Sequence, residues 1–352
     1  MIDNNKQLTE FLHSIKDDNE IAIDTEFKWV STYYPRLCLL QIASKNVAEC
    51  IDILALDDLT PLFDKLYQPN ILWIAHAARN DIEVLYRYSK RLPAQVFDTQ
   101  IAADFLKDLR PEISNFGAQI SYKDLTQILQ GVLLDKAYSR LDWSIRPLPE
   151  KAIEYALDDV VYLIKNYYQL KTLLEKGQKL NWLLEDGQSL LDSNLYEVDI
   201  FQAYNRLKGL WRLPQQAQLQ AVYLAAWREQ NAINKNKPRK WLLADNDLLD
   251  IAMGKRNLSV DKQQQFNIFL ANNPDKIKVE IDKNMPPTPE EKAQKLSLQK
   301  LIQEKANQYN LTTEIIANGK TLLRYIRGDQ SVKILSGWRY NLLKKELKCK
   351  TI

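Results

Sequence analysis

Residues 21–30 read IAIDTEFKWV, and this stretch decides how the fold is interpreted. Its apolar start is typical of a buried strand, and Asp24 and Glu26 stand at the end of that strand. Side chains alternate across a strand, so the two carboxylates must point to the same face. Asp-x-Glu is also common where a strand simply ends. However, two neighbouring negative charges repel each other unless a cation neutralises them, so the stretch also suggests a site.

Strand-like and helix-like segments alternate over residues 1–175, which indicates an α/β domain. Short apolar or alternating runs predict strands over 20–24, 37–42, 48–52, 71–75 and 95–97. Helical periodicity predicts helices over 5–14, 59–67, 81–88, 99–105 and 150–174. Asp98 precedes Thr99 as a helix N-cap, so we interpret Asp98 as structural.

The pattern changes near residue 200, where the strand signal disappears. Apolar residues recur at helical spacing within 207–227 and again within 296–343. Between them, NMPPTPEE at 284–291 is a linker by its proline content. The expected organisation is a domain over 1–175, a connecting segment over 176–202, a helical domain over 203–280, a linker over 281–292 and a second helical domain over 293–352.

Charge is divided unevenly along the chain. The net charge of +3 combines −10 over residues 1–200 with +13 over residues 201–352. An acidic half suits metal chemistry, and a basic half suits a polyanionic partner. Chance sorting of solvated surface charge is the alternative.

Cysteine usage and the N-terminus indicate where the protein works. The three cysteines, Cys38, Cys50 and Cys349, lack the spacing of a disulfide framework or a zinc ribbon, which favours a reduced intracellular setting. The first residues lack the layout of a secretory signal, and no apolar run approaches the ~20 residues that span a bilayer. We therefore expect a soluble, cytoplasmic protein without a membrane partner.

Further acidic residues stand in two later segments. Asp81 lies where a predicted strand gives way to a helix in IAHAARNDIEVL. Tyr155 and Asp159 in EYALDDVVYL are four residues apart, hence on one helix face. Four converging carboxylates require cations, and oxygen ligands suit Mg²⁺ or Mn²⁺. Two such ions, ~3.5 to 4 Å apart, are typical of in-line attack on a phosphodiester. With two histidines in the chain, a histidine-rich zinc site has little support.

The order and spacing of these residues resemble the DEDD superfamily of 3′→5′ exonucleases, in the subgroup with tyrosine in its third motif. Asp24 and Glu26 match the first motif, Asp81 the second, and Tyr155 with Asp159 the third. The chain is similar to the ribonuclease D family within it, on DTEF at 24–27, YYPRLCLLQI at 33–42, HAARNDIEVL at 76–85, VFDTQIAA at 96–103 and LDWSIRPLPEKAIEYALDDVVYL at 141–163.

Two departures from that family are small. Leu141 stands where serine is usual, and Asp158 adds an acid beside Asp159. Of these two acids, only Asp159 has the four-residue spacing to Tyr155.

The helical half extends the resemblance. The segment from 204 to about 270, which contains NKPRKWLLADNDLLDIA, resembles an HRDC domain, and LSGWRYNLL at 335–343 is similar to the second HRDC-like bundle of bacterial ribonuclease D. The resemblance therefore implies an α/β, ribonuclease H-like exonuclease domain with a mixed sheet, followed by two small all-α HRDC-like bundles.

The same resemblance, together with metal chemistry, implies a role for each site residue. Asp24 would bridge two metal ions, with Glu26 and Asp159 on the nucleophile side, and Asp81 would reach the second ion partly through water. Tyr155 would orient the attacking water, because a phenol pKa near 10 makes a poor base at neutral pH. Packing on the core is the alternative for Tyr155.

Each candidate RNA contact also has a structural alternative. Phe27 can stack on terminal bases or pack in the core, and His76 can touch the terminal nucleotide or be a satisfied structural residue. Trp143 and Arg146 flank the third motif, where Arg146 can meet a phosphate or pair with Glu150. A basic cluster that binds phosphates or forms a solvated loop comprises Lys235, Lys237, Arg239 and Lys240.

These features predict a metal-dependent 3′→5′ exoribonuclease. It would use two Mg²⁺ or Mn²⁺ ions to trim the single-stranded 3′ ends of structured RNA, releasing nucleoside 5′-monophosphates. The resemblance implies tRNA precursors as substrates, and no obligate protein partner is implied.

Three other functions are alternatives to this one. A DNA-directed 3′→5′ exonuclease remains open, because contacts with the 2′-hydroxyl cannot be read from the sequence. A catalytically silent RNA-binding adaptor is disfavoured because all four acids and the tyrosine are present. A structural Ca²⁺ site lacks the expected dense ligand loop.

Overall fold

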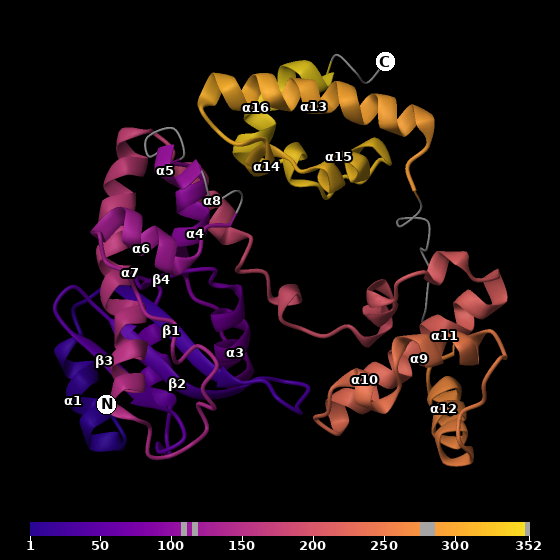
Figure 1. Ribbon diagram of the computed structural model, residues 1–352, viewed down its shortest axis with the longest axis horizontal. Helices are drawn as coiled ribbons and strands as arrows, with labels where there is room; N and C mark the ends of the chain where they lie inside the picture. The colour runs from indigo at the N-terminus through magenta and orange to yellow at the C-terminus, as the bar shows by residue number, and fades with distance from the viewer. Residues whose placement is uncertain (107–110, 115–118, 275–285, 349–352) are drawn as a thin grey trace. The chain divides into compact units, whose positions relative to one another are not determined.

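The computed structural model describes residues 1–106, 111–114, 119–274 and 286–348 (Figure 1). Its sheet has the strand order β3-β2-β1-β4-β5. The strands are β1 (Glu20–Lys28), β2 (Arg36–Ala43), β3 (Ala48–Asp52), β4 (Leu72–Ala75) and β5 (Gln95–Asp98). The pairs β1–β2 and β2–β3 are antiparallel, whereas β1–β4 and β4–β5 are parallel, so the predicted mixed sheet is confirmed.

Strand β1 is longer than the sequence predicts. It pairs with β2 as far as Lys28 opposite Arg36, with one register irregularity between Glu26 and Phe27. Asp24 and Glu26 therefore lie inside the strand, and the prediction that it ends at Asp24 is wrong. An apolar pattern stops at the first charged residue, whereas the antiparallel partner continues to supply backbone hydrogen bonds beyond it.

Helices cover both faces of the sheet. On β1, Ile21 and Ile23 pack into a cluster with residues of the first three helices, whereas Ala22 belongs to the cluster that contains the apolar face of α7. The long helix α7 packs across the sheet (Figure 1), against β1 to β4 and, through the ring of Tyr167, against Phe97 of β5. The helices up to residue 188 are α1 (Asn5–Ser14), α2 (Thr60–Leu66), α3 (Arg79–Ser89), α4 (Thr99–Asp104), α5 (Pro111–Ser114), α6 (Tyr122–Gln130), α7 (Glu150–Lys176) and α8 (Leu180–Gln188).

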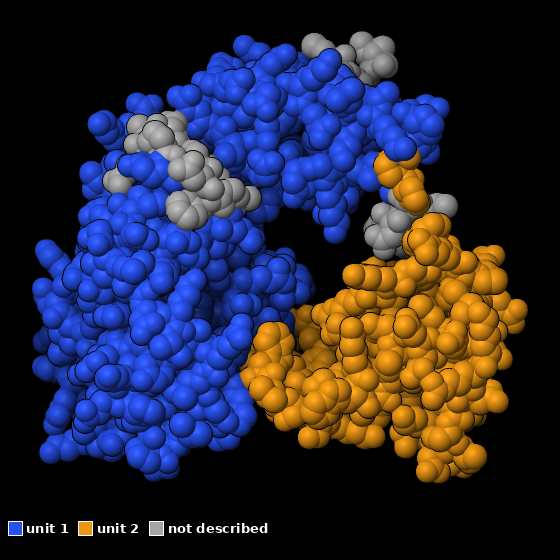
Figure 2. Space-filling view, viewed as in Figure 1, with its two compact units in different colours: residues 1–28, 36–196, 288–352 blue, residues 29–35, 197–287 orange. Residues whose placement is uncertain are grey.

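The chain forms two compact units (Figure 2). Unit 1 comprises Met1–Lys28, Arg36–Tyr196 and Thr288–Ile352. The sequence predicts a separate bundle over 293–352, whereas these helices share a hydrophobic cluster with the α/β residues. The described helices of this C-terminal segment are α13 (Pro289–Tyr309), α14 (Thr313–Ile316), α15 (Gly319–Ile326), η5 (Lys333–Leu335) and α16 (Gly337–Lys348).

Aromatic stacking and a buried ion pair attach these C-terminal helices to α8. The rings of Trp182 and Trp338 stack with centroids 4.9 Å apart. Arg339 binds both carboxylate oxygens of the buried Asp186, and its Nε donates to the carbonyl of Ile315 at 2.8 Å.

Unit 2 comprises Trp29–Pro35 and Glu197–Pro287, so the β1–β2 loop belongs to it (Figure 2). Its described part from residue 197 onward consists of helices and turns, packed around α9. The described helices of unit 2 are η2 (Ile200–Arg206), η3 (Leu210–Arg212), α9 (Gln215–Asn234), α10 (Arg239–Leu242), α11 (Asp245–Ala252) and α12 (Val260–Asn272), and the short η1 (Ser193–Leu195) precedes it.

One expectation concerns the junction between the predicted helical domains, and another concerns membrane-spanning helices. Residues 275–280 of the expected helical domain and 281–285 of the expected linker lie outside the described residues. Among the helices that are described, none combines the length and apolarity needed to cross a membrane.

Candidate active site

Three predicted metal ligands meet where β1 faces α7. Asp24 and Glu26 follow Ala22 at two-residue spacing, so they continue the side of β1 that α7 covers. Helix α7 carries Asp159, and one carboxylate oxygen from each of the three residues lies within 4.8 Å of the others. The alternation of the strand and the position of Asp159 on α7 thus produce a compact set of oxygen ligands.

Asp81 approaches the same place from the other side of the strand. It lies in the first turn of α3 and is buried. Its carboxylate accepts a hydrogen bond of 2.5 Å from the hydroxyl of Thr25, the residue between Asp24 and Glu26. Asp81 and the three clustered acids all line one cavity of about 350 Å³. All four predicted carboxylates therefore share a cavity.

Burial raises the pKa of all four carboxyl groups, and repulsion between the acids raises these pKa values further. The pKa of Glu26 rises to about 10 and that of Asp159 to about 7, whereas Asp24 and Asp81 have pKa values well above their ordinary range. Such a cluster retains protons at neutral pH unless a cation replaces them. Carboxylate oxygens are ligands that Mg²⁺ and Mn²⁺ accept, so the residues fit a hard divalent ion.

Tyr155 stands between two cavities on α7. It lines the acidic cavity and a smaller one of about 170 Å³, as Asp159 also does, whereas Asp158 lines the smaller one. Its ring lies against Trp143 and Tyr138, with centroid distances of 6.2 and 6.1 Å. Burial, and then the charge of Asp159, raise the pKa of Tyr155, so its hydroxyl stays protonated at neutral pH. The phenol can therefore orient a water molecule by hydrogen bonding.

Asp98 holds the turn that leads into α3. As the N-cap of α4, its carboxylate accepts the N–H of Gln100 at 2.8 Å, which confirms its predicted structural role. The same carboxylate accepts the N–H of Ala77 at 3.1 Å and of Ala78 at 2.9 Å. Ala77 has a φ of 58°, in the left-handed region that L residues rarely adopt. Asp98 thus fixes a strained turn three residues before Asp81.

Two predicted RNA contacts are corrected by their surroundings in unit 1. All five N–H groups of Arg146 donate, two to the carboxylate of Asp52 and three to backbone carbonyls. No N–H is left for a phosphate, and the ionic partner is Asp52 in place of the predicted Glu150. Trp143 is 2% exposed beside the Tyr155 ring, so it supports Tyr155 and presents no face to a base.

His76 and Phe27 both line the acidic cavity. The ring nitrogens of His76 lie 3.0 Å from the Thr99 hydroxyl and 3.1 Å from the Ile120 carbonyl oxygen. Each nitrogen thus has a hydrogen-bond partner within the protein, as expected if His76 is a structural residue. Burial lowers the pKa of His76. Phe27 also packs against the hydrophobic core, so stacking of its ring on a terminal base stays a prediction.

The predicted basic cluster lies at the turn between α9 and α10, in unit 2. Lys235 and Lys237 are exposed, whereas Arg239 is half-buried. Lys240 pairs with Asp245 at 3.3 Å. The four cations therefore differ in their availability to an anion.

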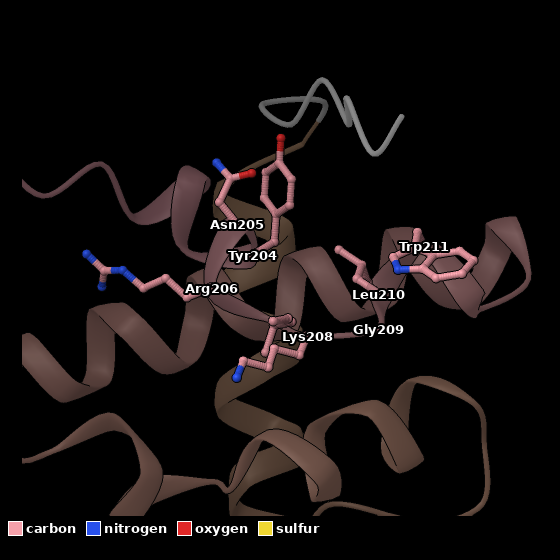
Figure 3. A pocket seen from close by; sticks show the side chains of 8 residues that line it. Tyr204, Asn205, Arg206, Lys208, Gly209, Leu210 and Trp211 are labelled. Carbon is pink, nitrogen blue, oxygen red and sulfur yellow. The ribbon is translucent and has the colours of Figure 1, made fainter. Parts of the chain in front are cut away.

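A separate cavity of about 460 Å³ in unit 2 is lined by residues 204–211. Figure 3 shows the side chains of Arg206 and Trp211 pointing in different directions there. Its eight lining residues include no carboxylate, so its chemistry does not match that of a hard-metal site.

Sequence reasoning missed Thr25 and Tyr122. Thr25 stands between two predicted ligands, but its partner Asp81 is 56 residues away. Tyr122 lines the acidic cavity from the start of α6, and its hydroxyl donates to the carbonyl of Asp158 at 3.0 Å. The alternation of β1 gives a partial signal for Thr25, whereas no local pattern distinguishes Tyr122 from a surface tyrosine.

Comparison with known proteins identifies the family of the chain. A family model described as 3′-5′ exonuclease matches residues 1–175. Ribonuclease D of Bartonella henselae is 33% identical over 355 residues, which cover 94% of this chain and 84% of the relative. Ribonuclease D of Sphingobium indicum is 32% identical, covering 97% of this chain and 91% of the relative. The crystal structure of Escherichia coli RNase D is similar with a TM-score of 0.81 at 24% identity, covering 98% of both chains. The chain therefore belongs to the ribonuclease D family of 3′→5′ exoribonucleases.

Proposed function

We propose that the chain removes nucleotides one at a time from the single-stranded 3′ ends of structured RNA, by two-metal-ion hydrolysis that releases nucleoside 5′-monophosphates. The observation that carries this proposal is the approach of Asp24, Glu26 and Asp159 to within 4.8 Å, in a cavity that Asp81 shares. Burying these acids together is unfavourable without cations. The arrangement is therefore best explained as a site for divalent metal.

Each residue has a task that its surroundings support. Asp24, Glu26 and Asp159 would hold Mg²⁺ or Mn²⁺, with Asp24 shared between two ions, and Asp81 would complete the set. When bound, such ions supply a more acidic water and stabilise charge on the leaving oxygen. Tyr155 stays protonated and orients the attacking water from the edge of the cavity. Thr25 keeps Asp81 in place through the hydrogen bond to its carboxylate.

Structured RNA with a single-stranded 3′ tail is the substrate class that the chain supports best. The relatives named ribonuclease D point to RNA, and the net charge of +13 over residues 201–352 suits the body of a polyanion. We further propose that the natural substrates are tRNA precursors and that the protein works in the cytoplasm. The HRDC-like helices would hold the folded part of the RNA while its tail enters the acidic cavity.

The first experiment is a time course on a 5′-labelled hairpin RNA with a 3′ tail, beside the matching DNA, with Mg²⁺, Mn²⁺ or EDTA. We expect a ladder that shortens from the 3′ end, requires metal and stops at the duplex. A DNA ladder of equal strength would support a DNA-directed enzyme instead. Binding without cleavage under any metal would indicate a silent adaptor.

Neighbouring acids provide a matched pair of variants. Asp159→Asn removes a clustered ligand and should abolish the ladder, whereas Asp158→Asn changes an equivalent acid outside the cluster and should retain it. Retained cleavage in Asp159→Asn or in Asp24→Asn, at normal metal dependence, would refute the metal assignment.

A further inference from the structure

The β1–β2 loop is seated on the helical part of unit 2. The backbone N–H groups of Tyr33 and Tyr34 both donate to the side-chain oxygen of Asn236, at 3.0 and 3.2 Å. Asn236 lies at the turn that follows α9 and has a φ of 44°. The indole N–H of Trp29 donates to the carbonyl of Tyr33 at 3.3 Å. The loop and the turn are therefore joined at Asn236, with Trp29 one hydrogen bond farther along the loop.

The buried carboxylate of Glu229 on α9 also binds this loop. The side chain of Glu229 on α9 is 1% exposed, and it accepts the hydroxyl of Tyr33 at 2.5 Å and a guanidinium N–H of Arg206 at 2.7 Å. Charge-assisted hydrogen bonds of this kind are stronger than neutral ones. The hydrogen bond from Tyr33 thus attaches the loop to α9 within unit 2.

The loop and the turn to which it is bonded carry exposed lysine and tryptophan side chains. Asn236 is flanked in the chain by Lys235 and Lys237, both exposed. Trp241, on the short helix α10 that follows, is 66% exposed, and Trp29 on the loop is 56% exposed. Large aromatics are usually buried because burial removes apolar area from water, so two exposed indoles, one on the loop and one on the helix after the basic turn, offer apolar area to a ligand.

We infer that the loop of residues 29–35 and the turn of residues 235–241 together form a binding surface for single-stranded RNA. Bases stack on Trp29 and Trp241, and phosphates contact Lys235 and Lys237. Aromatic faces accept any base, and lysines bind phosphates without regard to sequence, so the surface suits a tail of arbitrary sequence. The inference rests on the proposed function and adds the residues that hold the strand.

Single-stranded RNA fits this surface better than a double helix or an apolar protein partner. In an RNA duplex the bases are paired and stacked on one another, so their faces cannot reach an indole. A site for an apolar peptide would give no role to the exposed Lys235 and Lys237 of the turn. Stacking and phosphate contact together use every exposed side chain named here.

The test uses the full-length chain carrying Asp24→Asn, which prevents cleavage during binding measurements. Trp29→Ala and Trp241→Ala should each weaken binding of a 20-nucleotide oligo(A) by about tenfold or more. Joint replacement of Lys235 and Lys237 by Gln should reduce the slope of log K against log salt by about 1.4, the value expected for two phosphate contacts on a single strand. Ile268→Ala, an exposed apolar side chain of α12 in the same unit, should bind as the parent does.

A second readout separates this inference from the proposed function. With Asp24 restored, the ratio of kcat/KM on the 20-nucleotide strand to kcat/KM on a trinucleotide should fall in both tryptophan variants. Unchanged binding and an unchanged ratio in both variants would overturn the inference, while cleavage by the unmodified chain would still support the proposed function. An enzyme that cleaves neither substrate would instead refute the proposed function.

Discussion

Asp98→Asn tests whether the carboxylate that caps α4 also positions Asp81. An asparagine whose oxygen keeps the bonds to Ala77 and Gln100 must place its NH₂ group where the other oxygen accepts the N–H of Ala78. One charge-assisted hydrogen bond is lost, and the asparagine NH₂ faces the N–H of Ala78. The free energy of unfolding should therefore fall by about 2 to 3 kcal/mol. The helix cap survives, so the perturbation falls mainly on the turn before α3.

The consequence for catalysis follows from the geometry of that turn. A displacement of Asp81 by about 1 Å should lower kcat by roughly 10²-fold, because catalytic groups act only within narrow positions. The Mg²⁺ concentration needed for half-maximal activity should rise as well. Asp192→Asn, which changes the aspartate cap of η1, is the matched control and should leave both quantities unchanged.

Ala77→Gly supplies the decisive second variant. The left-handed conformation costs an alanine about 1 to 2 kcal/mol and a glycine almost nothing. Adding Ala77→Gly to Asp98→Asn should therefore raise the population of the native turn, and with it kcat, by about 5- to 30-fold. The assays are unfolding in urea, steady-state kinetics and Mg²⁺ titration. Lost stability with unchanged kcat and Mg²⁺ requirement, or no recovery on adding Ala77→Gly, would refute the positioning role.

Three further results are expected. Mg²⁺ at 100 times its Kd should stabilise the chain by about 2.7 kcal/mol, and Asp24→Asn should remove that gain in thermal melts; equal stabilisation of both proteins would contradict the metal site. In EDTA, the free energy of unfolding should fall as pH rises from about 4 to 7, because the four buried carboxyl groups keep protons that the unfolded state has lost in that window. Asp159→Asn removes one of these groups and should make the slope shallower in urea titrations at each pH; an unaltered slope would contradict this. Gly337→Ala should destabilise unit 1 by about 2 to 3 kcal/mol. Gly337 has a φ of 56°, and a Cβ there would meet the Glu185 carboxylate, which accepts the N–H of Trp338. An unchanged Tm in calorimetry would contradict this.

Local patterns in the sequence are sufficient to predict contacts between residues of one helix or strand, or between residues a few positions apart. The two-residue spacing of Asp24 and Glu26 places both beside α7, and the four-residue spacing of Tyr155 and Asp159 places both on the cavity. The sequence predicts Asp98 as a cap for the same reason, since its cap partners are two and three residues away. Its bonds to Ala77 and Ala78 span about twenty residues, and no periodicity signals them.

Long-range ion pairs show why charged residues were harder to assign. For Arg146 the sequence offers Glu150, one helical turn away, but the actual partner Asp52 is 94 residues distant. Sheet topology decides that pairing, because Asp52 is the last residue of β3. The C-terminal helices present the same difficulty, since the ion pair between Asp186 and Arg339 joins residues 153 positions apart.

The residues that reveal the activity are those that weaken the fold. A strand that pairs on both sides and lies under α7 would be more stable with apolar side chains at Asp24 and Glu26. Burial and mutual repulsion raise the pKa of both, so the metal-free fold is strained at this point and a bound cation relieves the strain. Local rules of strand formation therefore fail at the positions where function requires charge, and that failure makes the site visible in the sequence.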